Sequence, residues 1–187
     1  MQTKAYKNTE KRKKMKINTA EVSYKPLTPD YIPQLLEIQE ETFEYAKGNT
    51  DFLRRNTAET LSVCFPEPSL VLGAYYGGEM IAFGILHAAG EGKENLAHDL
   101  DEVSDIRENA NVKLTIVRPP YRGNGLQRLL IMKLEEHARG AGFKWLSSTV
   151  SPGNPWSKNN LEACGFTVAK ELEKYGGMKR ILLAKKL

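Results

Sequence analysis

The spacing of apolar residues changes along the chain, and each change predicts a different element. Residues 21–27 alternate between apolar and polar like an edge strand, and residues 28–46 then repeat apolar side chains at helical intervals. A second helix is expected around residues 50–64. The two β-rich runs that follow meet at Gly77-Gly78, a dipeptide suited to the positive φ angles of a tight hairpin.

The middle of the chain combines an irregular segment with a strand and a helix. Residues 91–110 are polar, acidic and without periodicity, so we expect an exposed insertion there. Residues 112–117 form a continuous β-branched run, which is typical of a strand buried on both faces. Leucines four residues apart then predict a helix that follows Gly125 and stops at Gly140.

The C-terminal part predicts a strand, a short helix and a hairpin. Residues 145–150 are the strand. Asn154 is suited to cap a helix of about ten residues that Gly165 ends. Residues 167–187 are expected to pair with one another around a two-glycine turn.

The order of these elements is β, α, α, β, β, β, α, β, α, β, β, which indicates one mixed α/β domain. A chain of 187 residues, of which 41% are hydrophobic, is long enough to bury one sizeable core. We therefore expect a single domain over residues 21–187, preceded by a basic and flexible leader over residues 1–20.

Most of the positive charge lies in this leader. The chain carries a net charge of +4, but residues 1–16 alone carry +6, which leaves −2 for the remainder. A nucleic acid partner is therefore disfavoured, because a solvated and disordered leader accounts for the basic run without one.

Cysteine usage and hydropathy indicate where the protein works. Cys64 and Cys164 lie a hundred residues apart with no CxxC or Cys/His spacing, which argues against a zinc site and suits a reducing compartment. No apolar run approaches the roughly 18 residues that a bilayer span requires, and no signal pattern opens the chain. We expect a cytoplasmic protein without a membrane partner. The oligomeric state stays open, a homodimer included.

The most informative stretch is VRPPYRGNGLQRLL, residues 117–130. A strand that enters a glycine-bearing loop and then a helix directs unpaired backbone N–H groups and the positive end of the helix dipole at one point, which attracts phosphate. Gly123 and Gly125 allow a diphosphate to approach the backbone, and Arg122 adds a guanidinium. The Walker pattern is absent, and Arg128 stands where the dinucleotide pattern needs its third glycine.

This stretch is similar to the coenzyme A loop of the GCN5-related N-acetyltransferase (GNAT) superfamily, V-x-P-x-Y-R-G-x-G-(L/I), which runs here from Val117 to Leu126. A second superfamily motif has an Asn, a small residue, a Tyr and a Gly-Phe pair. The same spacing occurs here at Asn154, Ser157, Leu161 and Gly165-Phe166. The resemblance covers residues 21–187 as an order of elements.

The resemblance implies the acyl-CoA N-acyltransferase fold. This fold is α/β, with a mixed, mostly antiparallel twisted sheet of about seven strands and flanking helices. Its two central parallel strands, here 112–117 and 145–150, splay apart, and acetyl-CoA lies in the gap. The residues that the resemblance assigns to cofactor binding are Val117, Arg122, Gly123, Asn124, Gly125, Leu126, Asn154, Ser157 and Asn160.

The implied reaction is acetyl transfer from acetyl-CoA to a primary amine of a small molecule or a peptide. The resemblance assigns the backbone N–H of Val117 to the oxyanion, a contact worth roughly 3 kcal/mol in the transition state. The tyrosine that often protonates the departing thiolate is replaced by Leu161. Tyr175, in the last hairpin turn, is a candidate to face the acceptor.

No general base can be assigned from the sequence. The first helix carries Glu40, Glu41 and Glu44, which are most simply a solvated face, and His87 and His98 have no evident partner. An amine at neutral pH is mostly protonated, so a base or a water chain must remove its proton before attack.

Three functions therefore remain open. The first is the acetyltransferase. The second is a non-catalytic regulatory module that binds acetyl-CoA, which the missing tyrosine motivates. The third is an RNA- or ribosome-associated protein that uses the basic leader, with the fold incidental.

Overall fold

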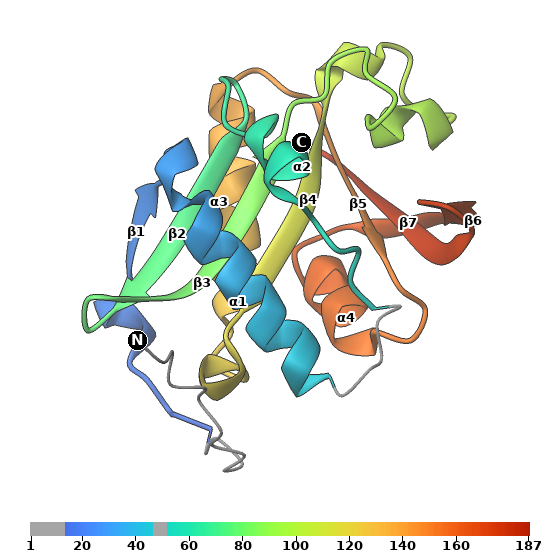
Figure 1. The fold of residues 1–187 in the computed structure, drawn as a ribbon. Coiled ribbons are helices and arrows are strands. Elements are labelled where there is room, and N and C mark those ends of the chain that lie inside the picture. Colours follow the sequence, from blue (N-terminus) through green and yellow to red (C-terminus); the bar gives the residue numbers. More distant parts are fainter. Residues whose placement is uncertain (1–13, 47–51) are drawn as a thin grey trace.

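The computed structural model describes residues 14–46 and 52–187, and it contains one seven-stranded sheet flanked by helices (Figure 1). Along the sheet the strands follow the order β1-β2-β3-β4-β5-β7-β6. The strands are β1 (Ser23–Pro26), β2 (Leu70–Tyr76), β3 (Glu79–His87), β4 (Asn109–Val117), β5 (Trp145–Val150), β6 (Thr167–Lys174) and β7 (Met178–Lys186). The α-helices are α1 (Ile32–Tyr45), α2 (Ala58–Ser62), α3 (Leu126–Gly140) and α4 (Pro155–Ala163).

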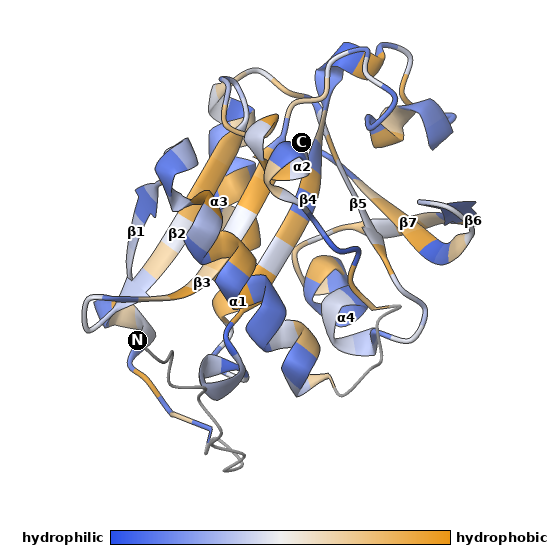
Figure 2. Cartoon of the chain, viewed as in Figure 1, coloured by the Kyte–Doolittle hydropathy of each residue, from blue (hydrophilic) through white to orange (hydrophobic). Residues whose placement is uncertain are grey.

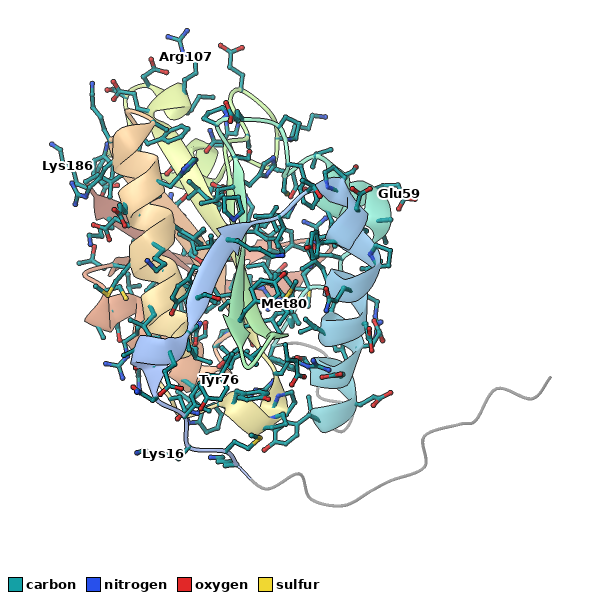
Figure 3. The ribbon with its side chains drawn as sticks, turned by 90° about the vertical axis from the view of Figure 1, so that its left-hand side faces the viewer. Lys16, Glu59, Tyr76, Met80, Arg107 and Lys186 are labelled. Atoms are coloured by element: carbon teal, nitrogen blue, oxygen red, sulfur yellow. The ribbon has the colours of Figure 1, made fainter. Side chains whose placement is uncertain are left out.

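Helices cover both faces of the sheet. Helices α1 and α2 pack on one face and α3 packs on the other, so that the sheet lies between α1 and α3 (Figure 3). Apolar residues line the strands and the inner sides of these helices (Figure 2). The expected mixed α/β fold is confirmed. No helix in the described part of the chain is long and apolar enough to cross a membrane.

The two central strands part as the resemblance implied. Parallel strands β4 and β5 pair only at Asn109↔Trp145, Ala110↔Leu146 and Asn111↔Ser147. Strand β5 then continues along β7 as far as Val150↔Ile181, while β4 stays with β3. The C-terminal halves of β4 and β5 therefore face each other across an open gap.

Local sequence signals explain the regular elements. Gly77 and Gly78 have φ angles of 58° and 83°, so the expected hairpin between β2 and β3 is confirmed. Helix α3 buries Leu126, Leu130, Leu134 and Ala138 from one face, as their spacing predicts. Each buried leucine contributes about 1.5–3 kcal/mol by leaving water, which fixes α3 against the sheet.

Residues 91–110 are only in part the exposed insertion that the sequence suggests, because apolar residues of this segment are buried. They form the 3-10 turns Leu96–Asp99 and Ile106–Glu108. Leu96, Leu100 and Val103 are buried against Leu182 and Ala184 of β7. The buried part was not predicted because 3-10 turns have no helical periodicity, so the apolar residues look isolated in the sequence.

Two further expectations need correction. Strand β4 is not buried on both faces throughout, because Lys113, Thr115 and Val117 are only half-buried where β5 has moved away. The second helix is much shorter than the expected 50–64. It begins after Thr57, whose side chain accepts a hydrogen bond from the N–H of Thr60 in a capping box.

The folded part of the chain begins before residue 21. The N–H of Met15 donates to the carbonyl of Pro120 at 2.7 Å, and Ile17 packs into the core with 9% of its surface exposed. Residues 1–13, which contain most of the expected basic leader, lie outside the described residues.

Candidate active site

The gap between β4 and β5 opens into a cavity of about 770 Å³. Its walls are the parted strands, the loop at residues 121–125, the first turn of α3 and one face of α4. None of the described residues that line the cavity is an Asp or a Glu. Four cationic side chains line it: Lys14, Lys113, Arg122 and Arg128. The cavity therefore suits a ligand with several negative charges.

The loop before α3 presents free backbone donors to this cavity. Gly123 and Gly125 have φ angles of 88° and 76°, and Gly125 caps α3 without a side-chain hydrogen bond. In the described part of the chain, nothing accepts the N–H groups of Gly123, Asn124, Gly125 or Leu126. Together with the helix dipole, these groups form a site for an anion such as a diphosphate.

Arg122 lies in the cavity wall and anchors the loop. Its Nε donates to the carbonyl of Val117 at 3.1 Å, and its guanidinium lies 4.8 Å from the centre of the Tyr45 ring. Burial lowers the pKa of this guanidinium. Arg122 therefore holds its positive charge beside the cavity while it ties the loop to β4 and α1.

The side chain of Asn124 points away from the cavity, and only its backbone N–H belongs to the anion site. The Asn124 amide donates to the carbonyl of Met15 at 2.8 Å and accepts from the N–H of Ile17 at 3.2 Å. This pairing holds the segment before β1 against the loop and places Lys14 in the cavity wall.

Helix α4 forms the opposite wall. Asn154 caps it, because its Oδ1 accepts from the N–H of Ser157 at 3.1 Å. Ser157 and Asn160 line the cavity, as does Leu161, and both polar side chains contact Gln127 of α3.

Gln127 is a site residue that the sequence reasoning missed. Its Nε2 donates to Thr115 of β4 at 3.1 Å and to Ser157 at 3.0 Å, and its Oε1 accepts from Asn160 at 2.8 Å. It therefore links β4 to α4 across the cavity. Its place in the first turn of α3, directly after the glycine loop, was a signal that could have identified it.

The backbone of Val117 faces the cavity. The N–H of Arg118 donates to the carbonyl of Ile81 on β3 at 2.9 Å. Because successive residues of an antiparallel strand direct their backbone groups to opposite sides, the N–H and C=O of Val117 point toward β5. The Val117 carbonyl accepts from Nε of Arg122, so among the described residues only the N–H of Val117 is left without a partner beside the open gap.

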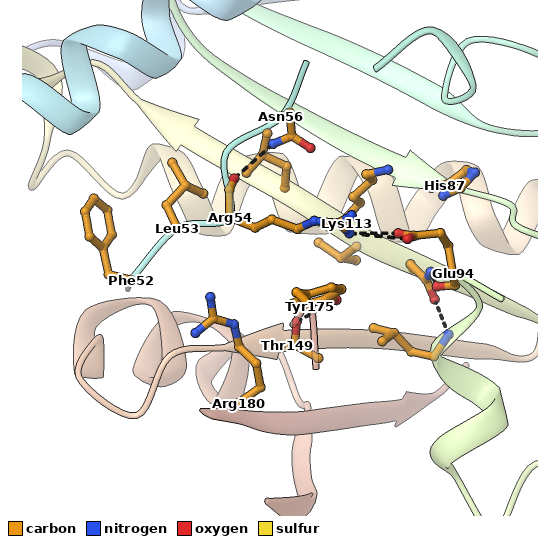
Figure 4. Close-up of a pocket in the computed structure, with 14 residues that line it drawn as sticks. Phe52, Leu53, Arg54, Asn56, His87, Glu94, Lys113, Thr149, Tyr175 and Arg180 are labelled. Carbon is orange, nitrogen blue, oxygen red and sulfur yellow. Dashed lines mark hydrogen bonds and ion pairs between the residues drawn. The ribbon is translucent and has the colours of Figure 1, made fainter. Parts of the chain in front are cut away.

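A second cavity, of about 70 Å³, meets the first where the strands begin to part (Figure 4). The residues that line both are Phe52, Leu53, Val112, Lys113, Leu114 and Thr149. At this junction β4 has a bulge, since Ile85 pairs with Leu114 but Leu86 pairs with Val112. The extra residue, Lys113, has its backbone groups outside the ladder.

Tyr175 lies in the wall of the second cavity, next to the junction. Its hydroxyl is 3.2 Å from Oγ1 of Thr149, and the Arg54 guanidinium lies 4.5 Å from its ring centre. Arg54 in turn pairs with Glu94 at 3.0 Å. Tyr175 is also the only described non-glycine residue with a positive φ, 56°, a conformation that costs free energy and is frequent at functional sites.

The candidate bases differ in whether they lie at one of the two cavities. Glu40 pairs with Arg55 and Glu41 with Arg118, and neither they nor Glu44 lines either of the two cavities described above. His98 also lies outside both cavities. Of the candidates, only His87 lines the second cavity. The described residues contain no group of three or more His, Cys, Asp or Glu side chains that could hold a metal ion.

Comparison with protein families gives one match. The model of the Acetyltransferase (GNAT) family matches residues 32–166, which include both motifs and most of the cavity walls. No curated protein matches the chain in sequence.

Solved structures share the fold at low sequence identity. A ribosomal-protein-alanine N-acetyltransferase from Brucella melitensis is 20% identical, with a TM-score of 0.67 over 88% of this chain and 99% of its own. yncA from Salmonella typhimurium, solved with its cofactor acetyl-CoA, is 16% identical, with a TM-score of 0.65 over 88% and 93%. An aminoglycoside acetyltransferase, AAC(6')-Ib, in complex with coenzyme A and kanamycin is 15% identical, with a TM-score of 0.65 over 88% and 94%.

Proposed function

The chain belongs to the GNAT family of acetyltransferases, and from this premise we propose that it transfers the acetyl group of acetyl-CoA to a primary amine of a small molecule or a peptide. The observation that carries the proposal is the cavity between β4 and β5. Four cationic side chains line this cavity, and none of its described lining residues is an Asp or a Glu. The turn before α3 adds four N–H groups without an acceptor. These features suit the phosphates of coenzyme A.

The fold neighbours support this choice of ligand and reaction. One was solved with acetyl-CoA and another with coenzyme A and kanamycin. By their names, the acceptors of two neighbours are a ribosomal-protein alanine and an aminoglycoside, so the shared fold serves both peptide and small-molecule amines.

We assign the diphosphate to the N–H groups of Gly123, Asn124, Gly125 and Leu126, with Arg122 beside them. The pantetheine arm would run along β4 from Val117 toward Lys113, where the strand's backbone groups face the gap. Asn154, Ser157 and Asn160 would contact the cofactor from α4. All of these residues except Asn124 line the cavity, and Asn124 is included because it lies in the same loop between Gly123 and Gly125.

The acetyl group would then reach the junction of the two cavities. Four residues of strand separate Val117 from Lys113, a distance of ~13 Å at ~3.3 Å per residue. Val117 is therefore better placed to pair with the arm than to bind the oxyanion. The N–H of Lys113, which the bulge frees at the junction, is the nearer oxyanion donor.

The departing thiolate needs a proton. Leu161 cannot supply it, and we propose that Tyr175 does, because its hydroxyl lies beside Thr149 at the junction. A thiolate, with a pKa near 8.5 for a cysteine side chain, is a good leaving group, so slow transfer would persist without this proton donor.

We propose that the enzyme acts in the cytoplasm. Both Cys64 and Cys164 are free thiols, as a reducing compartment favours. Cell fractionation with an antibody against the native protein would test this, and recovery in an exported fraction would contradict it.

Release of free thiol from acetyl-CoA tests the reaction. We expect the full chain to release thiol with at least one of three amines: glycinamide, a peptide that begins with alanine, or kanamycin. Mass spectrometry should find the acetylated amine. Tight binding of acetyl-CoA without transfer to any amine would instead identify a regulatory module.

A further inference from the structure

We propose that His87 is the base that takes the proton from the acceptor amine. This inference rests on the proposed function, and it assigns a catalytic role to a residue at the end of β3.

His87 is a buried side chain without a partner. It retains 7% of its surface, and its Nδ1 is enclosed with no hydrogen-bond partner among the described residues. No hydrogen bond of the other ring nitrogen is found there either. Burying a polar group without a hydrogen bond costs about 1–3 kcal/mol of folding free energy. A structural role alone therefore does not explain a histidine at this position.

The ring stands at the wall of the second cavity, close to the side chains of Lys113 and Glu94 (Figure 4). Glu94 makes no hydrogen bond to His87 among the described residues, and its carboxylate accepts from Nη1 of Arg54 instead. The other histidines differ. His137 contacts the carbonyl of Pro68 at 3.0 Å, and neither it nor His98 lines either of these two cavities.

The surroundings keep the imidazole neutral. Burial lowers the pKa of His87, and the positive charge of Lys113 lowers it further, while Glu94 opposes this. The charged and titratable side chains that line the same cavity come from four segments: Arg54, Glu94, Lys113, Tyr175 and Arg180. A neutral imidazole has a free lone pair at neutral pH, as a base requires.

The proton balance of the reaction is then complete. One ring nitrogen of His87 takes a proton from the ammonium, and the freed lone pair of the amine attacks the carbonyl carbon. A C–N bond forms as the C=O electrons move to oxygen. When they return, the C–S bond breaks and its electrons leave on sulfur. Tyr175 gives its hydroxyl proton to that sulfur and takes the second amine proton in return, and the imidazolium releases its proton to water.

The test compares H87Q with wild type and with H98Q as the matched control, because His98 is exposed and outside both cavities. Thiol release is measured from pH 5.5 to 9.5 with the acceptor found above and with hydroxylamine, which is already unprotonated at neutral pH. We expect H87Q to lower kcat/KM for the alkylamine by about 10²–10⁴-fold. Transfer to hydroxylamine should fall much less, and the affinity for acetyl-CoA should not change.

H98Q should behave like wild type. An H87Q variant with the wild-type rate and pH profile would overturn the assignment and leave the proposed function intact. If H87Q also loses acetyl-CoA binding, added imidazole decides the matter: rescue of H87A supports the assignment and no rescue contradicts it. Failure of the wild type to acetylate any of the amines would overturn the proposed function and this inference together.

Discussion

The hydroxyl of Ser147 donates to Oδ1 of Asn111, at 3.0 Å, across the last paired position of the parallel strands β4 and β5. Asn109 also donates to the Ser147 hydroxyl, at 2.9 Å, and all three side chains are buried. The point at which the strands part is thus fixed by a polar network, and the cavity begins directly beyond it.

The first prediction concerns this network. S147A removes a hydroxyl that both donates and accepts, and it leaves buried groups of Asn109 and Asn111 with fewer partners. We expect the free energy of unfolding to fall by about 1–3 kcal/mol in urea titrations. S62A, at an exposed position, should change it by less than about 0.5 kcal/mol. Equal stability of S147A and wild type would mean that the network does not fix the strands.

The second prediction concerns the glycine loop. Alanine at Gly125 would meet no atom within 4 Å, but the φ angle of 76° strains any residue with a β-carbon. G125A should therefore cost about 1–2 kcal/mol or shift the loop, and the affinity for coenzyme A should fall about tenfold in calorimetry.

The matched control for that variant is G140A. Gly140 lies in the last turn of α3, where an added β-carbon meets nothing within 4 Å and the φ is not left-handed. It should bind coenzyme A like wild type and be as stable or slightly more so. Unchanged affinity in G125A would remove the loop from the phosphate site.

The third prediction concerns the segment before β1. Lys14 lines the large cavity, whereas Lys16, two residues away and also exposed, does not. K14A should weaken coenzyme A binding by about threefold to tenfold, with a difference from wild type that shrinks at high salt. K16A should have little effect. Equal effects of the two variants would show that only the general positive charge matters.

The fourth prediction provides a binding signal. Trp156 lines the cavity and is 76% exposed, so its indole is free to stack on the adenine ring of coenzyme A. Its fluorescence should change on binding in wild type and in W145F, but not in W156F. The chain has two tryptophans, so a change that persists in W156F would come from Trp145 and contradict this placement.

The fifth prediction concerns stability and pH. Because burial lowers the pKa of His87, the unfolded chain binds more protons than the folded one between the lowered value and ~6.5, the ordinary value. His87 therefore destabilises the fold as the pH falls through this window. The stability of H87Q should decline less than that of wild type between pH 7 and pH 5 in parallel denaturation series. Identical slopes would mean that His87 has an unperturbed pKa.

The sequence predicted those parts of the fold that depend on local signals. Glycines mark the β2–β3 hairpin and the start of α3, and Asn154 and Gly165 mark the ends of α4, because caps and positive φ angles restrict the residue type. The anion site was predictable for the same reason, since it consists of the main chain of one short loop.

Long-range packing accounts for what the sequence did not reveal. Leu96 and Leu100 look isolated in a polar segment, and only the approach of β7 buries them. The bridge made by Gln127 and the unpartnered ring of His87 depend on which side chains the sheet brings together. Neither the hydrophobic periodicity nor the residue spacing of the sequence predicts these contacts.

The central claim is that the cavity between β4 and β5 binds acetyl-CoA through the turn at the start of α3. Isothermal titration of the full chain with acetyl-CoA tests it most directly. We expect saturable binding of one molecule per chain, with an affinity that falls as salt is raised. The absence of measurable heat at millimolar acetyl-CoA would contradict the claim.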